Sequence, residues 1–310
     1  MRMKKLVPTF LSALAILLFS CTKNKSEATD TSTPKRYRDV MFSTVQITKN
    51  IQYGQAINYR RTGMEELYLD LYMPENDAET NRPLVIGVHG GAFIAGDKEA
   101  ANWPEVCKAL AKRGYVAASV NYRLGRNAGE EYEPAWRAQQ DVRAAIRFAR
   151  ANAGSIKINP NKIFIMGSSA GGATCLITAY MDAPEAPATV NQTVWGTIEG
   201  NSGSPGYSSA VSGVVNLWGG VSDTLAIGGT IPVGLLHSLY DPTVPYASSY
   251  DPVRNVTTYG SRSIYTRAKN AGITTQLKTY FYNGHDDGLY PPYLDTTIQF
   301  SAAFLYPLTK

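Results

Sequence analysis

The sequence predicts an α/β protein in which a mostly parallel, twisted sheet carries helices on both faces. Apolar strand-like runs alternate with helix-like segments from residue 67 to residue 305. Several of these runs, including 83–88 and 163–166, are apolar throughout, as expected for strands that are buried on both faces. A glycine-rich turn also joins one such strand directly to a helix, an arrangement typical of α/β folds.

The predicted elements follow one another along the chain with recognisable boundaries. The predicted strands cover residues 67–72, 83–88, 115–120, 163–166, 213–217, 233–236 and 276–281. The predicted helices cover residues 106–113, 133–152, 173–180, 263–270 and 293–305. The first strand alternates polar and apolar residues, whereas the run at 83–88 is continuously apolar. Gly114 ends the first helix, and Pro134 stands in the first turn of the second, where proline is tolerated.

The first 35 residues differ from the rest of the chain. Residues 1–20 combine a basic start with an apolar run that is too short to span a bilayer, so we expect a signal peptide of the lipoprotein type. Cys21 is the expected lipidation site, and the polar segment 21–35 is the expected flexible tether. Residues 36–310 are then one catalytic domain. We expect an exported protein, anchored by its lipid to a membrane of a bacterial envelope.

Charge and cysteine content exclude several classes of protein. The net charge is +5, and removing Arg2, Lys4 and Lys5 with the signal reduces it to +2, which is too little to indicate nucleic-acid binding. Cys107 and Cys175 fall in helices on opposite faces of the predicted sheet, so we expect two buried free thiols. The scattered histidines predict no metal site, and neither a phosphate-binding loop nor a dinucleotide fingerprint indicates a cofactor.

The turn at residues 167–172, Gly-Ser-Ser-Ala-Gly-Gly, supplies a candidate nucleophile, Ser169. A serine hydroxyl attacks well only when a base takes its proton and a sharp turn exposes its oxygen. Such a turn needs small residues two positions before and after the serine, and Gly167 and Gly171 meet this need for Ser169. Ser168 lacks glycines at both of these positions, so we reject it.

A second glycine-rich turn, His89-Gly90-Gly91-Ala92-Phe93, directly follows a predicted buried strand. Backbone N–H groups in such a turn can face a developing oxyanion without interference from side chains. We therefore expect the oxyanion hole to consist of the N–H groups of Gly91, Ala92 and Ala170, the residue after the nucleophile.

His285 follows the last predicted strand and is the candidate general base. Of the other histidines, His89 belongs to the oxyanion turn, and His237 is expected to brace the loop that carries the acid. The preferred acid is Asp241, because Asp-Pro-Thr-Val-Pro gives it a rigid turn after a strand. Its rivals are Asp223, after the preceding strand, and Asp286 or Asp287 beside the histidine.

These motifs resemble those of the α/β-hydrolase superfamily, specifically the hormone-sensitive-lipase-like and bacterial feruloyl-esterase-like carboxylesterases. The order Ser, Asp, His along the chain agrees with this fold. The matching motifs lie at residues 89–93, 97–98, 121–124, 159–160, 167–172, 241–245 and 284–285. Ala92 departs from the pattern, since many relatives carry a third glycine there.

The resemblance implies an exported enzyme that hydrolyses short-chain esters or acetyl and feruloyl esters linked to polysaccharides. Only about 30 residues separate the nucleophile helix from the next strand, so we expect an open cleft without a large lid domain. Trp195, Tyr207, Tyr290 and Tyr293 are the candidate substrate-binding residues, with residues 195–207 as a cleft wall. Two alternatives stay open: a serine peptidase of the same fold, and a non-catalytic surface binding protein on a hydrolase scaffold.

Overall fold

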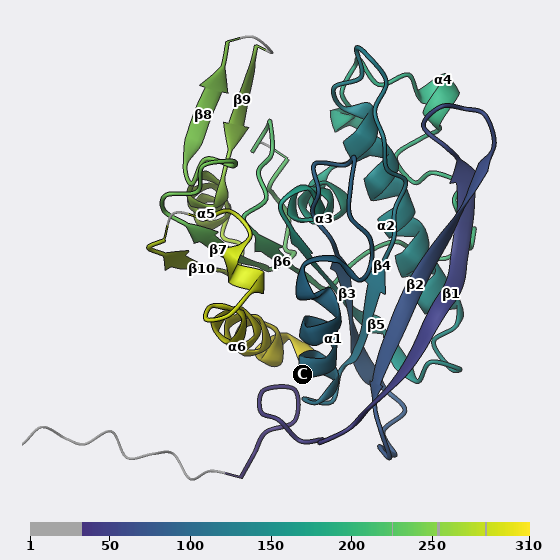
Figure 1. Cartoon of the computed structure of the whole chain (residues 1–310), viewed down its shortest axis with the longest axis vertical. Helices are drawn as coiled ribbons and strands as arrows, with labels where there is room; N and C mark the ends of the chain where they lie inside the picture. The colour runs from purple at the N-terminus through teal and green to yellow at the C-terminus, as the bar shows by residue number, and fades with distance from the viewer. Residues whose placement is uncertain (1–32, 225, 253–254, 283) are drawn as a thin grey trace, which may run out of the picture. The chain divides into compact units, whose positions relative to one another are not determined.

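An eight-stranded sheet lies at the centre of the computed structural model (Figure 1), in the order β1-β2-β4-β3-β5-β6-β7-β10. β2 runs antiparallel to β1 and to β4, and all the other neighbouring strands are parallel. The strands are β1 (Val45–Ile57), β2 (Met64–Pro74), β3 (Arg82–Val88), β4 (Val116–Val120), β5 (Ile158–Ser168), β6 (Gly213–Leu217), β7 (Val233–Ser238) and β10 (Thr275–Tyr280). The predicted mostly parallel sheet is therefore confirmed.

The structure describes residues 33–224, 226–252, 255–282 and 284–310. The expected signal peptide, Cys21 and all but the last three residues of the expected tether lie outside these ranges. Residues Pro34–Lys310 form one compact unit. Within the described ranges, none of the helices has the length and apolar character needed to cross a membrane.

Helices cover both faces of the sheet, as predicted. The α-helices are α1 (Trp103–Ala111), α2 (Glu133–Ala151), α3 (Ala170–Tyr180), α4 (Gln192–Trp195), α5 (Ser261–Asn270) and α6 (Leu294–Leu305). Four short 3-10 helices accompany them: η1 (Ala100–Asn102), η2 (Ala183–Glu185), η3 (Asp287–Leu289) and η4 (Tyr306–Thr309). α2, α3 and α5 pack on one face of the sheet, and α1 and α6 pack on the other.

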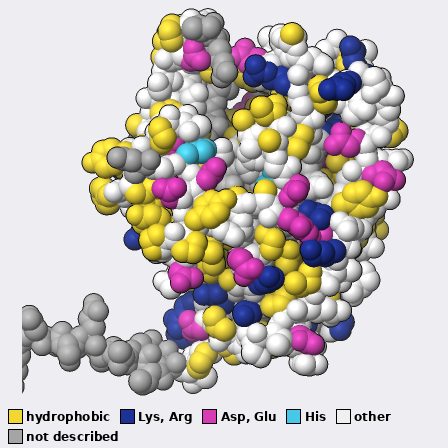
Figure 2. All heavy atoms as spheres, in the orientation of Figure 1, with side chains coloured by type: hydrophobic (Ala, Val, Ile, Leu, Met, Phe, Trp, Pro, Cys, Tyr) yellow, Lys and Arg dark blue, Asp and Glu magenta, His cyan; other side chains and the backbone are white. Residues whose placement is uncertain are grey.

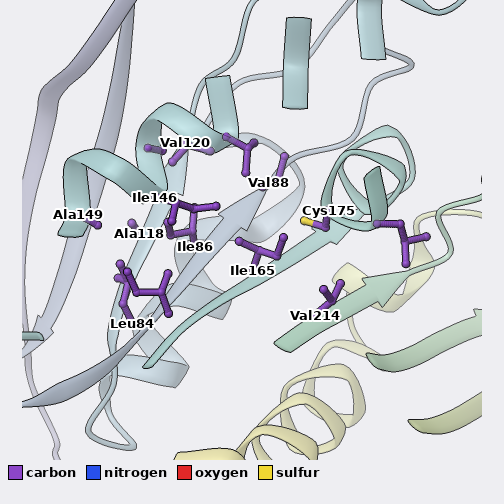
Figure 3. Packing of buried hydrophobic residues seen from close by; sticks show 14 of the residues in the cluster. Leu84, Ile86, Val88, Ala118, Val120, Ile146, Ala149, Ile165, Cys175 and Val214 are labelled. Carbon is purple, nitrogen blue, oxygen red and sulfur yellow. The ribbon is translucent and has the colours of Figure 1, made fainter. Parts of the chain in front are cut away.

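The strands divide their side chains between two hydrophobic cores because successive residues of a strand point to opposite faces. On β3, Leu84 and Ile86 join the core beneath α2, where Figure 3 shows them near Ile146. Val85, between them, joins the core beneath α1. Each fully buried aliphatic side chain of this kind contributes about 1.5–3 kcal/mol of transfer free energy.

The two cysteines lie in different cores. Cys175 of α3 is buried in the core that contains Leu84, whereas Cys107 of α1 is buried in the core that contains Val85. Both are free thiols. The sheet separates them, which confirms the prediction of two unpaired, buried cysteines.

Three strands were not predicted from the sequence. β1 is an edge strand whose residues are mostly exposed, so its polar composition does not show the apolar alternation of a buried strand. β8 (Ser248–Asp251) and β9 (Val256–Tyr259) form a separate antiparallel hairpin of short strands that are rich in Ser and Thr. β8 is mostly exposed, and β9 is half-buried. Figure 1 shows this hairpin projecting beyond the end of β7 and β10.

Candidate active site

Ser169 is the single residue between the end of β5 and the start of α3, and its backbone has φ of 52° and ψ of −120°. This is a strained conformation for a residue with a side chain, and it turns the hydroxyl out of the sheet. The turn is tight enough to require glycine: a Cβ on Gly167 would lie 2.2 Å from the carbonyl oxygen of Gly171. A Cβ on Gly171 would lie 2.1 Å from the carbonyl oxygen of Val88. Ser168, by contrast, is buried at the end of β5.

The structure brings Ser169, His285 and Asp241 into one hydrogen-bonded row. The His285 Nε2 atom lies 2.7 Å from Ser169 Oγ, and its Nδ1 atom lies 2.7 Å from Asp241 Oδ2. Because a carboxylate only accepts hydrogen bonds, Nδ1–H donates to Asp241 and Nε2 is free to accept the proton of the serine. This is the arrangement that general-base activation of a serine requires.

Asp241 is held as a carboxylate by its surroundings. Burial would raise its pKa, but hydrogen bonds from His237, His285 and the backbone N–H groups of Val244 and Thr243 outweigh burial and lower the pKa well below the usual range. The backbone N–H groups of Thr243 and Val244 donate to Oδ1 over 2.8 and 2.9 Å. The side chain itself is fully buried. The negative charge therefore stays available to stabilise a protonated His285.

The three rival acids lie elsewhere. Asp223 lines a cavity beside α3. Asp286 accepts a hydrogen bond from Trp218 Nε1 over 3.0 Å. Asp287 is the first residue of η3, and its carboxylate lies against Gly284. Asp241 is therefore the carboxylate that the structure places on His285.

The three residues predicted as oxyanion donors lie in the turn after β3 and at the start of α3, and a Cβ on Gly90 of that turn would lie 3.1 Å from Ser169 Cβ. Gly91 and Ala92 have positive φ values of 107° and 53°, which turn the backbone outward from the end of β3. Ile94 and Ala95 both donate their N–H groups to the Gly91 carbonyl, so this turn is held in shape. Ala170 opens α3, where the first N–H groups have no acceptor inside the helix and the helix dipole favours negative charge.

Motif residues that do not face the nucleophile brace the oxyanion turn. The ring of His89 stacks on Tyr122 with 4.4 Å between centroids, and the Tyr122 hydroxyl donates to the His89 carbonyl over 3.0 Å. Lys98 forms a buried ion pair with Asp70 over 3.2 Å, which ties the far end of the turn to β2. Burial lowers the pKa of His89, so this side chain is neutral and serves packing.

A cavity of about 280 Å³ begins one helical turn beyond Ser169. Ala173, Leu176, Ile177 and Tyr180 of α3 form one wall. The hairpin residues Asp251, Val256 and Thr258 form part of another wall. The remaining lining residues are Phe93, Glu131, Tyr132, Ala135, Trp136, Met181, Glu185, Pro187, Gly220, Val221, Ser222, Asp223, Ala226 and Ile227. The cavity thus has a largely apolar interior beside the candidate nucleophile and the oxyanion turn.

Comparison with known proteins identifies the family. The sequence model of the BD-FAE family matches residues 69–230, which is just over half of the chain. The chain belongs to the BD-FAE family. The match includes the oxyanion turn and Ser169, and it ends before Asp241 and His285. The fold of this BD-FAE member is shared with solved proteins that are described as esterases.

The sequence similarities of this BD-FAE member to individual relatives cover only part of the chain, whereas the structural similarity covers most of it. It is 34% identical to the neuroligin-like protein glit-1 of Caenorhabditis elegans over 38% of the chain and 16% of that protein. It is 35% identical to carboxylesterase 3B of Mus musculus over 34% of the chain and 19% of that protein. The chain thus spans less than a fifth of the length of either relative. A truncated carbohydrate esterase from gut microbiota shares the fold with a TM-score of 0.64 at 20% identity, over 89% of this chain and 99% of that one.

None of the four predicted substrate-binding aromatics lines the cavity in this BD-FAE member, and two of them belong to the segment 195–207. Trp195 is buried against Trp136, and the guanidinium of Arg137 lies 4.5 Å from its ring centroid. Tyr207 is exposed and lines a different surface depression, beside Glu199. Neither side chain lines the cavity beside α3.

The segment 195–207 does not form a wall of the cavity because α2 and β1 hold it elsewhere. Gln140 of α2 donates to the carbonyls of Trp195 and Thr197 over 2.8 and 2.7 Å. The Ser202 hydroxyl donates to the buried carboxylate of Asp141 over 2.7 Å. The sequence showed the aromatic residues of this segment but not the buried polar partners on α2 that fix its path.

The other two aromatics lie on the His285 side of the site. Tyr290 is exposed, and Tyr293 packs its ring on Tyr282 with 4.3 Å between centroids. Neither is among the residues that line the cavity of this BD-FAE member. Sequence reasoning missed Phe93, Trp136 and the hairpin as lining groups, because their proximity arises only when α2, α3 and the segment after β7 fold together.

Proposed function

We propose that this chain is a serine carboxylesterase that acts through Ser169, His285 and Asp241 by way of an acyl-enzyme. The observation that carries the proposal is the position of the His285 ring, with 2.7 Å hydrogen bonds to both partners. A histidine so placed can take a proton from the serine because the opposite nitrogen is already committed to a carboxylate.

The reaction follows from this geometry. As Ser169 Oγ attacks the ester carbonyl, its proton moves to His285 Nε2, and the buried charge of Asp241 stabilises the imidazolium. The oxyanion develops toward the N–H groups of Gly91, Ala92 and Ala170. His285 then protonates the departing alcohol. A water molecule repeats the sequence on the acyl-enzyme and releases the acid.

We propose short-chain esters, and acetyl or feruloyl esters linked to polysaccharides, as the substrates. A cavity of about 280 Å³ lies just below the range typical of pockets for drug-sized ligands, so it suits a small acyl or aryl group. Three aromatic side chains, Tyr240, Phe281 and Tyr290, are exposed near the triad loops, where they are available to stack on sugar or aryl rings. Figure 2 shows hydrophobic side chains gathered on the side of the molecule that carries β7 and β10. The fold is shared with a protein described as a carbohydrate esterase.

The test is initial-rate kinetics of the full chain and of Ser169→Ala with p-nitrophenyl acetate, butyrate and decanoate. We expect rapid hydrolysis of the two short esters and a loss of several orders of magnitude in the variant. Equal rates for the two proteins would refute the triad. Absence of ester hydrolysis together with cleavage of peptide substrates would instead favour a peptidase, and binding without turnover would favour a binding protein.

We propose further that the protein is exported and anchored through a lipid on Cys21. The support is the order of a basic start, a short apolar run and a cysteine in residues 1–21. In a bacterial host, the full chain should incorporate a fatty-acid label and sediment with membranes, whereas Cys21→Ala should not be labelled. Equal labelling of the two chains would refute the proposed anchor.

A further inference from the structure

His237 lies behind the triad, inside the protein. It belongs to β7, its side chain is fully buried, and it does not line the cavity beside Ser169. Both of its ring nitrogens nevertheless have polar partners: Nδ1 faces Ser261 of α5, and Nε2 faces the loop that carries Asp241. A histidine enclosed in this way acts through its hydrogen bonds and not through contact with a substrate.

The neighbours of His237 determine which nitrogen carries the proton. The backbone N–H of Ser261 points at Nδ1 over 3.4 Å, and the Ser261 hydroxyl lies 2.9 Å from the same atom. Since a backbone N–H can only donate, Nδ1 is an acceptor. Nε2 faces two oxygens that accept, the Val244 carbonyl at 3.1 Å and Asp241 Oδ2 at 3.2 Å. The neutral ring is therefore protonated on Nε2, and this N–H is directed at the triad acid.

We propose that His237 is a positioning residue for the reaction: the Nε2–H, oriented by Ser261, holds the Asp241 carboxylate in the plane that His285 needs. This inference rests on the proposed function, because it gives His237 a role only if Asp241 supports a catalytic His285.

The need for such a donor follows from the place of Asp241 in a loop. Among the residues that the structure describes, two backbone N–H groups hold its Oδ1, whereas Oδ2 faces two side-chain donors, His285 Nδ1–H at 2.7 Å and His237 Nε2–H at 3.2 Å. The carboxylate is fully buried, so bulk water cannot replace a missing donor. Without His237, Oδ2 depends on His285 alone, a ring whose Nε2 gains and loses a proton in every catalytic cycle.

The support for His237 extends to a third element. Asn216 of β6 points its side-chain N–H group at Ser261 Oγ over 3.4 Å, which directs the serine hydroxyl proton toward His237. The His237 ring also packs at a near right angle against the ring of Tyr246, with 5.7 Å between centroids. Strands β6 and β7 and helix α5 thus hold the donor rigidly relative to the sheet, while the acid itself lies on a loop.

Two neutral substitutions separate positioning from packing. His237→Gln can place an amide N–H near the position of Nε2, within reach of Asp241, whereas His237→Asn reaches only the position of Nδ1, beside Ser261. We expect Asn to lower kcat by about ten- to a hundredfold, as for the loss of a hydrogen bond to a charged group, with KM within about twofold of the parent value. We expect Gln to keep kcat within about threefold of the parent value. Thermal unfolding of both variants controls for stability.

The outcomes separate this inference from the proposed function. If Ser169→Ala abolishes hydrolysis but the Asn and Gln variants have equal kcat values, the positioning role is refuted and the esterase proposal stands. If Ser169→Ala retains full activity, both fail. Should neither His237 variant fold, Ser261→Ala decides: a fall in kcat of threefold or more at constant KM supports the inference, and an unchanged kcat overturns it.

Discussion

Exchange of Asp241 for asparagine should reverse the proton arrangement of the candidate triad. Oδ1 accepts two backbone N–H groups over 2.8 and 2.9 Å, so the amide oxygen of asparagine must occupy that position. The amide NH2 group then faces His285 Nδ1, which in the parent protein donates over 2.7 Å. Two donors cannot bond to each other, so Nδ1 must give up its proton and Nε2 must carry it toward Ser169.

This tautomer cannot take a proton from the serine, and the loss can be estimated. Asparagine in place of a triad aspartate keeps the geometry but costs about 10⁴-fold in kcat where it has been measured in serine hydrolases. That factor corresponds to about 5.5 kcal/mol of transition-state stabilisation. We expect a loss of about 10³- to 10⁴-fold in kcat for Asp241→Asn with little change in KM, measured with p-nitrophenyl butyrate at pH 7.

Asp286→Asn is the matched control, because it makes the same chemical change at a carboxylate that accepts a hydrogen bond from Trp218 Nε1 and is not part of the cavity lining. Its kcat should stay within about threefold of the parent value. The reasoning is refuted if Asp286→Asn loses activity by orders of magnitude while Asp241→Asn remains active.

Three further perturbations test other parts of the structure. Gly171→Ala places a Cβ 2.1 Å from the backbone oxygen of Val88 and should destabilise the protein by about 3 kcal/mol or more in thermal or urea unfolding. A Cβ on Gly154 would have no heavy atom within 4 Å, so Gly154→Ala should be close to neutral. Equal unfolding midpoints for the two variants would contradict the crowding at Gly171. Ile177→Trp narrows the cavity and should reduce kcat/KM for the decanoate ester about tenfold relative to the acetate; an unaltered ratio would place the acyl chain elsewhere. Burial would raise the pKa of Asp77, but hydrogen bonds from two arginines lower it to about 2. A carboxyl group whose pKa is lowered in the folded state stabilises the fold above its unfolded pKa of about 4, and this gain disappears as the pH falls toward 2. Between pH 4 and pH 2, the free energy of unfolding of Asp77→Asn should therefore fall less than that of the parent, by about 1 kcal/mol after solvent screening.

Much of the fold could be predicted because local patterns report burial directly. β3 and β6 match their apolar runs at 83–88 and 213–217 to within one residue, since a strand covered on both faces consists mainly of apolar residues. β1 escaped prediction because most of its side chains face solvent. Its long antiparallel pairing with β2, and not an apolar composition, holds it in the sheet. The β8–β9 hairpin escaped prediction because its two strands are only four residues long each and rich in Ser and Thr.

The candidate site divides in the same way. Ser169 and the oxyanion turn were visible in the sequence because a sharp strand-to-helix turn and an outward-facing backbone demand glycines at fixed spacings. Local chemistry could also rank Asp241 above Asp223, through the prolines that stiffen its turn. The path of residues 195–207 could not be deduced in this way, because buried side chains of α2 decide it.

By itself, the sequence determined the α/β class, the nucleophile turn and the order of the triad residues, because each depends on neighbours within a few positions along the chain. Only the tertiary structure decided which carboxylate meets His285, which residues line the cavity and which nitrogen of His237 carries a proton. These features join residues that are tens of positions apart, such as His285 and Ser169, 116 residues apart. Their contacts exist only after the sheet has aligned the ends of its strands along one edge.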